Sequence, residues 1–248
     1  MMEPIIINDI RLPPGHNERD LAELAARRSG LSVQAVLDAG WRIVRKSVDA
    51  RRNPRIYLLY SVLIGGGAPV LAGIDNLIQH KAYAPDRPVV AGAGPAGLFA
   101  ALALAIAGQK PLVIEQGKQV EQRQIDVARF WQTGKLDPFS NVQFGEGGAG
   151  TFSDGKLTTG VKDPRCRAVL EEMVLAGAPE EILFLARPHV GTDHLRRVVQ
   201  GLREKIIRFG GEFRFSCRLD GLQHAAGRLT GLILDRKSTR LNSSHGII

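Results

Sequence analysis

Cysteine is scarce in this chain, whose 248 residues include only two, Cys166 and Cys217. Two distant cysteines without a CxxC pair exclude a disulfide framework, a thioredoxin-like redox pair and a cysteine zinc site. A secretion signal is also lacking, because the N-terminal sequence MMEPIIINDIRLPPG has acids and a Pro-Pro break where a signal peptide requires a basic start and an apolar core. We therefore predict no metal site, buried or incidental thiols, and a cytoplasmic location.

A concentrated basic surface is lacking as well. The formal net charge is +8, but the excess is spread thinly along the chain, so a nucleic-acid partner is not favoured. We interpret the densest basic run as the solvated edge of a small sheet rather than an RNA-binding face. This run contains Arg42, Arg45, Lys46, Arg51, Arg52 and Arg55.

One stretch imitates a membrane span. Residues 89–108 carry no charged side chain, and about 20 apolar residues are enough to cross a bilayer. Three glycines and Pro95 divide the stretch into a short β-type run and an Ala/Leu-rich helix. We therefore predict a buried strand, turn and helix, and no membrane span.

Residues 1–80 predict a small α+β domain with the order β-α-β-β. We expect strands over Ile5–Ile10, Trp41–Val48 and Arg55–Ile64, a helix from the capping residue Asn17 to Arg28, and a short helix near Asp75–His80. The stretch DARRNP indicates a hairpin turn at Asn53-Pro54. Prolines and mixed charges then indicate a linker over residues 81–88.

Residues 89–235 show an α/β pattern. A strand over Val89–Ala91, a helix over Pro95–Ala107 and a strand over Pro111–Glu115 predict a βαβ unit with a right-handed crossover. Later elements are expected over Lys118–Thr133 (helix), from a cap at Thr192 or Asp193 to Phe209 (helix), and over Glu212–Cys217, Leu219–Gln223 and Leu229–Leu234 (strands).

The turn of this unit reads Gly92-Ala93-Gly94-Pro95-Ala96-Gly97. Gly92 permits a tight turn, Gly94 leaves room for a pyrophosphate against the backbone, and Gly97 lets helix and strand approach closely. Glu115 follows at about the 20-residue spacing at which an acid accepts hydrogen bonds from an adenosine ribose; an acid there argues against a 2′-phosphate. The pattern predicts dinucleotide binding at the helix N-terminus. The alternative is a tight βα turn followed by an ordinary strand-end glutamate.

The fingerprint does not separate NAD from FAD, because both present the same ADP half. An NAD domain usually continues with helix-strand alternation, whereas this chain inserts about 70 residues, including the loop GEGGAGTFSDGKLTTG, before its third strand. That layout resembles the glutathione-reductase-like FAD superfamily, so FAD is the favoured cofactor.

Four blocks of sequence resemble bacterial FAD-dependent (NAD(FAD)-utilising) dehydrogenases, over roughly residues 40–235: PVVAGAGPAGLFAALALA, LVIEQGKQVEQR, NVQFGEGGAGTFSDGKL and ARPHVGTDHLRRVVQGLREKIIRFGGEFRF. The resemblance implies an α/β fold class, with an FAD-type Rossmann-like parallel sheet and an incomplete β-meander after the small domain. It also implies a cofactor site in which the glycine turn holds the pyrophosphate, Glu115 the ribose and Arg123 a phosphate oxygen. The loop residues pass beside the isoalloxazine, where glycine allows close approach. The site comprises Gly92, Ala93, Gly94, Pro95, Ala96, Gly97, Glu115, Gln116, Arg123, Gly147, Gly148 and Thr151.

A few other side chains have two interpretations each. Lys156 could tune the flavin by stabilising its anionic reduced ring, or it could simply face water. His189 and His194 could donate protons, although structural or solvated roles are favoured. Trp131 and Phe139 could cover the ligand, although core packing is the preferred interpretation.

The resemblance ends after the meander, because the Ala-Thr-Gly type turn and the later Gly-Asp segment of the superfamily do not follow. The sequence RKSTRLNSSHGII resembles a translated sequencing adaptor, so we expect residues 236–248 to be foreign and disordered. We also expect this chain to be an inactive fragment that retains FAD weakly or not at all.

These patterns lead to one favoured function and two alternatives. The favoured one is an FAD-dependent oxidoreductase that transfers hydride through the flavin, with a small-molecule substrate and NAD(P)H as a candidate electron donor. The alternatives are an NAD-binding dehydrogenase domain, and an RNA- or partner-binding module of a flavin-dependent RNA-modifying assembly. The sequence does not indicate the substrate, the catalytic residues or the oligomeric state.

Overall fold

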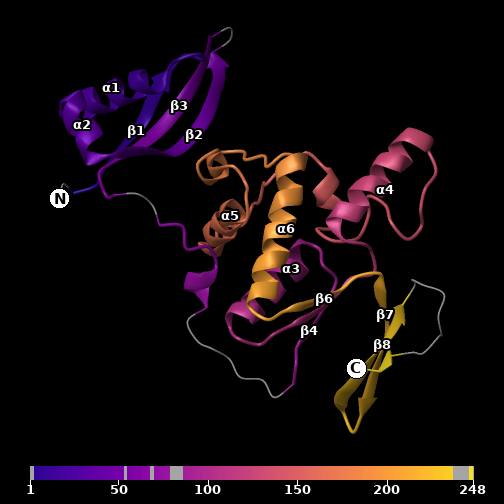
Figure 1. Ribbon diagram of the computed structural model, residues 1–248. Coiled ribbons are helices and arrows are strands. Elements are labelled where there is room, and N and C mark those ends of the chain that lie inside the picture. The colour runs from indigo at the N-terminus through magenta and orange to yellow at the C-terminus, as the bar shows by residue number, and fades with distance from the viewer. Residues whose placement is uncertain (1–2, 53–54, 68–69, 79–85, 237–245, 248) are drawn as a thin grey trace. The chain divides into compact units, whose positions relative to one another are not determined.

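The computed structural model describes residues 3–52, 55–67, 70–78, 86–236 and 246–247. The chain forms two compact units, whose elements are labelled in Figure 1. The first unit contains residues 1–71, 156–162 and 179–189, and the second contains residues 72–155, 163–178 and 190–248. The sequence predicts a contiguous domain over residues 1–80. The structure adds two later segments, residues 156–162 and 179–189, to the first unit, and the sequence did not indicate them. Residues 81–85 of the predicted linker lie outside the described residues.

The first unit is an antiparallel sheet covered by two helices. Its strands are β1 (Ile5–Leu12), β2 (Trp41–Arg52) and β3 (Arg55–Ile64), in the order β1-β3-β2. Helices α1 (Glu18–Ser29) and α2 (Val33–Ala39) lie against this sheet (Figure 1). The helices and the sheet share a core that includes Ile10, Leu21, Ala25, Val36, Tyr60 and Val62.

The ends of α1 follow from local sequence. The Asn17 side chain accepts a hydrogen bond from the Asp20 amide, and the Asp20 side chain accepts one from the Asn17 amide. This capping box confirms the predicted start of the helix. Helix α2, which Ser32 caps, is not predicted from the sequence. The predicted turn at Asn53-Pro54 lies outside the described residues.

The predicted basic run lies on β2 and at the start of β3, where Arg45, Arg51 and Arg55 are exposed. Strand β2 is one of the two outer strands, as expected for a sheet edge. The stretch 179–189, which contains a short 3-10 helix (Glu180–Leu183), returns to this edge. There the Lys46 amide donates to the Phe184 carbonyl at 2.8 Å and the Ala186 amide donates to the Lys46 carbonyl at 2.9 Å.

The second unit contains the predicted parallel sheet. Strands β4 (Val89–Ala91), β5 (Leu112–Ile114) and β6 (Glu212–Arg214) pair in parallel in the order β4-β5-β6. Helix α3 (Pro95–Ile106) connects β4 to β5. An antiparallel sheet follows, formed by β7 (Cys217–Ala225), β8 (Arg228–Arg236) and β9 (Gly246–Ile247). The mixed α/β fold class is therefore confirmed.

The second unit also contains four α-helices within its described residues. They are α3, α4 (Val120–Thr133), α5 (Arg165–Leu175) and α6 (Thr192–Arg208), with short 3-10 helices at Asp75–Leu77 and Ala149–Phe152. Helix α3 packs against α6 (Figure 1). The face of α6 that carries Val198, Val199, Leu202 and Ile206 is buried, as its apolar spacing predicts. Both faces of β5 are buried, and its Leu112 and Ile114 pack with Cys217 of β7.

Three expectations about this unit are corrected or resolved. Helix α6 begins after Gly191 without a side-chain cap, so capping by Thr192 or Asp193 is wrong; the Thr192 hydroxyl donates instead to the Ser153 carbonyl. Of the tail predicted to be disordered, Arg236 ends β8 and Gly246–Ile247 pair with that strand, whereas residues 237–245 and 248 lie outside the described residues. Within the described ranges, no helix is long and apolar enough to cross a membrane.

Candidate cofactor-binding site

The glycine turn connects β4 to α3, and its backbone lies close both to β5 and to the first turn of α3. Gly92 has a φ of 97°, a value that favours glycine, and its amide donates to the Ile114 carbonyl of β5 at 2.7 Å. A Cβ atom on Gly97 would lie 1.9 Å from the Gly92 carbonyl oxygen. The turn therefore requires glycine at position 97 in order to keep the helix close to the strand.

Gly94 needs glycine neither for its backbone conformation nor for packing within the described residues. It is the N-cap of α3, with Pro95 as the first helical residue. Its φ is −71° and its ψ is 179°, which is ordinary extended backbone. A Cβ atom on Gly94 would meet no atom within 4 Å. The absence of a side chain here leaves open space in front of the first amides of α3.

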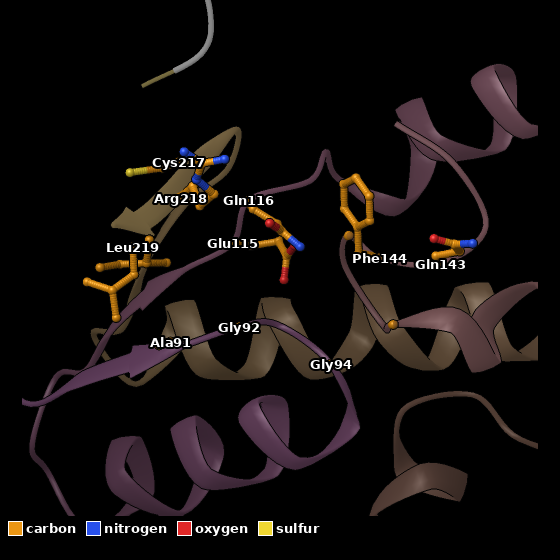
Figure 2. Close-up of a pocket in the computed structure, with 13 residues that line it drawn as sticks. Ala91, Gly92, Gly94, Glu115, Gln116, Gln143, Phe144, Cys217, Arg218 and Leu219 are labelled. Atoms are coloured by element: carbon orange, nitrogen blue, oxygen red, sulfur yellow. The ribbon is translucent and has the colours of Figure 1, made fainter. Parts of the chain in front are cut away.

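The Glu115 carboxylate is fixed at the end of β5. One oxygen, Oε2, accepts from the Ala93 amide of the glycine turn at 2.7 Å, and the other, Oε1, accepts from the Gly117 amide at 2.8 Å. The residue is buried. Figure 2 shows its side chain pointing toward the turn, with Phe144 on the other side of the pocket. The carboxylate thus ties the turn to the strand in addition to facing the pocket.

Replacing Glu115 by glutamine tests this tie. Glutamine offers one acceptor oxygen in place of two, so one of the two buried amides loses its partner. We expect the free energy of unfolding to fall by about 1–3 kcal/mol in urea denaturation. Glu212→Gln is the matched control, because Glu212 is 45% exposed on β6 and exposed ion pairs contribute less than about 1 kcal/mol. Equal stability of Glu115→Gln and the wild type would show that the two hydrogen bonds contribute nothing.

The glycine-rich loop lies against the same turn. The Gly147 amide donates to the Ala93 carbonyl at 2.8 Å. A Cβ atom on Gly148 would lie 3.3 Å from Cδ of Pro95, and one on Gly147 would lie 2.1 Å from the Thr151 hydroxyl. Thr151 itself is buried. The structure therefore brings together the turn and the loop, which lie some fifty positions apart in the sequence.

Arg123 anchors this loop from α4. It has no exposed surface, and its guanidinium donates to backbone carbonyls. These acceptors are the carbonyls of Asn141, Val142, Glu146 and Gly148. The guanidinium also lies 4.9 Å from the centre of the Phe152 ring. The arrangement is that of a loop anchor and leaves no exposed surface for a phosphate, so a direct phosphate contact stays a prediction that this geometry does not favour.

A pocket of about 320 Å³ lies between the turn, the end of β5, the loop and the start of β7 (Figure 2). Its lining contains Gly92, Gly94, Glu115, Gln116 and Gly148 from the predicted site. Eight further lining residues were not predicted as site residues: Ala91, Ile114, Gln143, Phe144, Gly145, Cys217, Arg218 and Leu219. Of these, Gln143, Phe144 and Gly145 lie in the segment that leads into the glycine-rich loop, and Cys217, Arg218 and Leu219 lie at the start of β7.

The other predicted site residues do not line this pocket. Ala93, Pro95, Ala96, Gly97, Arg123, Gly147 and Thr151 support the turn and the loop without lining the pocket. Lys156 and His189 belong to the first unit, where they form an isolated antiparallel bridge, so a role of Lys156 at a flavin stays a prediction. His194 lies in the first turn of α6.

The sequence favoured core packing for the aromatic side chains of Trp131 and Phe139, and the structure places both at the surface. Trp131 on α4 is 63% exposed and Phe139 is 52% exposed. Core packing, the preferred interpretation, is therefore wrong for both. Phe139 instead lines a second pocket of about 210 Å³, which shares Gln116, Phe144 and Arg218 with the first.

The parallel βαβ unit with its glycine turn defines an α/β domain of the Rossmann-like class. Residues 87–194 match the family of FAD binding domains, and residues 4–65 match a domain of unknown function, DUF8436. The match supports FAD as the cofactor. The residues present fit the ADP half of that molecule, since Gly94 leaves space against the helix N-terminus and a carboxylate lies at the end of the next strand.

Comparison of the whole sequence with those of other proteins finds a relative in a bacterium. The chain is 39% identical over 251 residues to a protein of Clostridium beijerinckii described as uncharacterized. The match covers 94% of this chain and 46% of that relative, so the chain spans about half of its length.

Among solved structures, similarity is found to L-amino acid deaminases of two Proteus species. The enzyme of Proteus myxofaciens, in complex with anthranilate, is 13% identical and matches with a TM-score of 0.28 over 64% of this chain and 45% of its own. The enzyme of Proteus vulgaris is 14% identical and also has a TM-score of 0.28, over 64% of this chain and 47% of its own. TM-scores at this level carry no argument about function.

Proposed function

We propose that the second unit binds the ADP half of FAD and forms part of an FAD-dependent oxidoreductase. One observation carries the proposal: the glycine turn, the open space at Gly94 and the buried Glu115 carboxylate converge on one pocket. Independent support comes from the match of residues 87–194 to FAD binding domains. FAD, when bound, supplies hydride transfer through its flavin ring.

Each part of the pocket has a proposed role. The first amides of α3 would face the pyrophosphate, because they have no partners within the helix and lie at the positive end of its dipole. The Glu115 carboxylate would accept from the ribose hydroxyls while it keeps its bonds to the backbone. Gly147, Gly148 and Thr151 would let the loop pass closely beside the cofactor. A small molecule is the proposed substrate and NAD(P)H the proposed electron donor.

Gly94→Ala is the most direct test of the proposal that the pyrophosphate binds against the backbone at position 94. The backbone at position 94 accepts any residue, and the new methyl group meets no protein atom, so stability should fall by no more than about 1 kcal/mol, the cost of alanine at an N-cap. A dinucleotide against this backbone would clash with the methyl group, and we expect the affinity for FAD and for ADP to fall at least about tenfold. Isothermal titration calorimetry with each ligand measures the loss.

The matched control is Gly160→Ala, since a Cβ atom there also meets nothing within 4 Å and Gly160 does not line the pocket. This variant should bind FAD and ADP like the wild type. If Gly94→Ala binds both ligands with unchanged affinity, the pyrophosphate does not bind at the glycine turn and the proposal fails.

A further inference from the structure

Glu146 is a buried carboxyl group behind the glycine-rich loop. Its residue has no exposed surface. Both hydrogen bonds to its side chain are accepted by one oxygen, Oε2, which takes the Val120 amide at 2.8 Å and the Arg203 guanidinium at 2.6 Å. The other oxygen, Oε1, is buried without a hydrogen-bond partner within the part of the chain that the structure describes.

This pattern suits a neutral carboxylic acid. Arg203 at Oε2 favours the ionised form, but Oε1 is buried without a donor, and an unpaired charged oxygen there costs more than the unpaired neutral hydroxyl of the protonated acid. Burial is also the main reason that the pKa of Glu146 is raised to about 7; the Val120 amide, Arg203 and Arg123 lower it, and Glu121 raises it further. The unpaired Oε1 and the raised pKa together point to proton exchange near neutral pH.

The charged side chains around Glu146 come from two helices. Arg203 of α6 binds Glu146 and also pairs with Glu121 at the start of α4. Arg123 of α4 donates to the Glu146 carbonyl. With Glu146 ionised, the four side chains have no net charge, and with Glu146 protonated they carry one positive charge. We call these four residues, Glu121, Arg123, Glu146 and Arg203, the loop cluster.

The loop cluster is connected to the cofactor turn through the backbone. The Glu146 amide donates to the Lys118 carbonyl at 3.1 Å, and the next amide, that of Gly147, donates to the Ala93 carbonyl. The position of Glu146 therefore helps to determine where the loop meets the turn. Arg203 fixes that position from α6, a helix that itself packs against α3.

We propose that Glu146, held by Arg203, is a positioning residue for the cofactor loop, and that its single exchangeable proton makes FAD binding tighter when the carboxyl group is neutral. The inference rests on the proposed binding of FAD at this loop. The direction follows from charge: the pyrophosphate of FAD is a dianion, and protonation of Glu146 makes its surroundings one unit more positive, whereas the charge of the nearby Glu115, which also acts on Arg123, is the same in both states. Reciprocally, bound FAD should raise the pKa of Glu146.

The test measures FAD affinity against pH. We expect the dissociation constant of the wild type, measured by calorimetry, to rise about three- to fivefold from pH 6 to pH 8, the size of a partly screened interaction between charges. Glu146→Gln imitates the neutral acid, since its amide oxygen can take the place of Oε2, and its profile should be flat. Glu204→Gln is the matched control, because Glu204 is exposed on α6 next to Arg203 and its loss should leave the slope of the wild type unchanged.

Stability of the ligand-free chain gives a second, independent readout. Because the pKa of folded Glu146 lies above the ordinary value of 4.5, its protonation stabilises the fold fully below pH 4.5, and this contribution is lost as the pH rises through about 7. The wild type should therefore lose stability relative to Glu146→Gln between pH 5 and pH 8 in urea denaturation.

The outcomes separate the two proposals. Absence of FAD binding at every pH would refute the proposed function, while the stability profile would still decide whether Glu146 exchanges a proton near neutral pH. If FAD binds but the wild type and Glu146→Gln have parallel pH profiles of affinity, Glu146 does not control the loop and this inference is overturned. Parallel stability profiles would overturn it as well.

Discussion

Replacing Arg123 by methionine is expected to lower the free energy of unfolding by about 3–5 kcal/mol, the usual cost of removing one partner from a buried ionic group. The guanidinium is the donor for four loop carbonyls and has no exposed surface. Methionine fills a similar volume but donates nothing, so buried carbonyls lose their partner. Glu146 also loses a nearby cation. Urea denaturation at pH 7 measures the difference.

The control for this prediction lies on the same helix. Arg129 of α4 is 62% exposed and makes only a 3.6 Å pair with Asp126, so Arg129→Met should change stability by less than about 1 kcal/mol. A loss of that small size in Arg123→Met as well would show that the loop does not depend on its buried cation. A loss of FAD binding without a loss of stability would instead indicate that Arg123 contacts the phosphate directly.

Gly97→Ala is expected to have the second-largest effect. Its Cβ atom would lie 1.9 Å from the Gly92 carbonyl oxygen, which belongs to backbone and cannot rotate away. The Gly92 amide is bonded to β5, so relief requires α3 to move away from the sheet. We expect a loss of about 3 kcal/mol in the free energy of unfolding, at the upper end of the usual cost of overpacking.

Gly94→Ala is the control for this change, because the same methyl group added three residues earlier meets nothing. The two variants should separate the two roles of glycine: Gly97→Ala loses both stability and FAD affinity, and Gly94→Ala loses FAD affinity with little change in stability. Unchanged stability of Gly97→Ala would contradict the close approach of α3 and β4. Thermal unfolding monitored by circular dichroism gives the comparison directly.

Elements with local signals were predictable from the sequence. The apolar runs on either side of the glycine turn place β4, α3 and β5 to within about one or two residues, because each run is bounded by glycine or proline. The helix start at Asn17 is encoded by the capping box itself. Helix α2 was missed because its seven residues are too few to show a period. Helix α5 was missed because it begins after Pro164 without a side-chain cap that would mark its start.

The candidate site was predictable in part. Gly92, Gly94 and Glu115 could be found because one short segment of chain supplies the turn and the acid. Phe144 and Arg218 could not be found, since they reach the pocket only through the fold of the loop and of β7. The burial of Glu146 could not be foreseen either, because its partners Val120 and Arg203 come from two separate helices.

The return of residues 179–189 to the first unit constrains how the chain can acquire its structure during synthesis. The Lys46 backbone pairs with residues 184 and 186, so the outer edge of β2 is completed only after the ribosome has made almost 140 further residues. Until then β2 emerges as an outer strand whose Lys46 backbone lacks these partners, a feature that invites pairing with other nascent chains. The order of synthesis therefore makes the amino-terminal sheet dependent on a segment encoded far downstream.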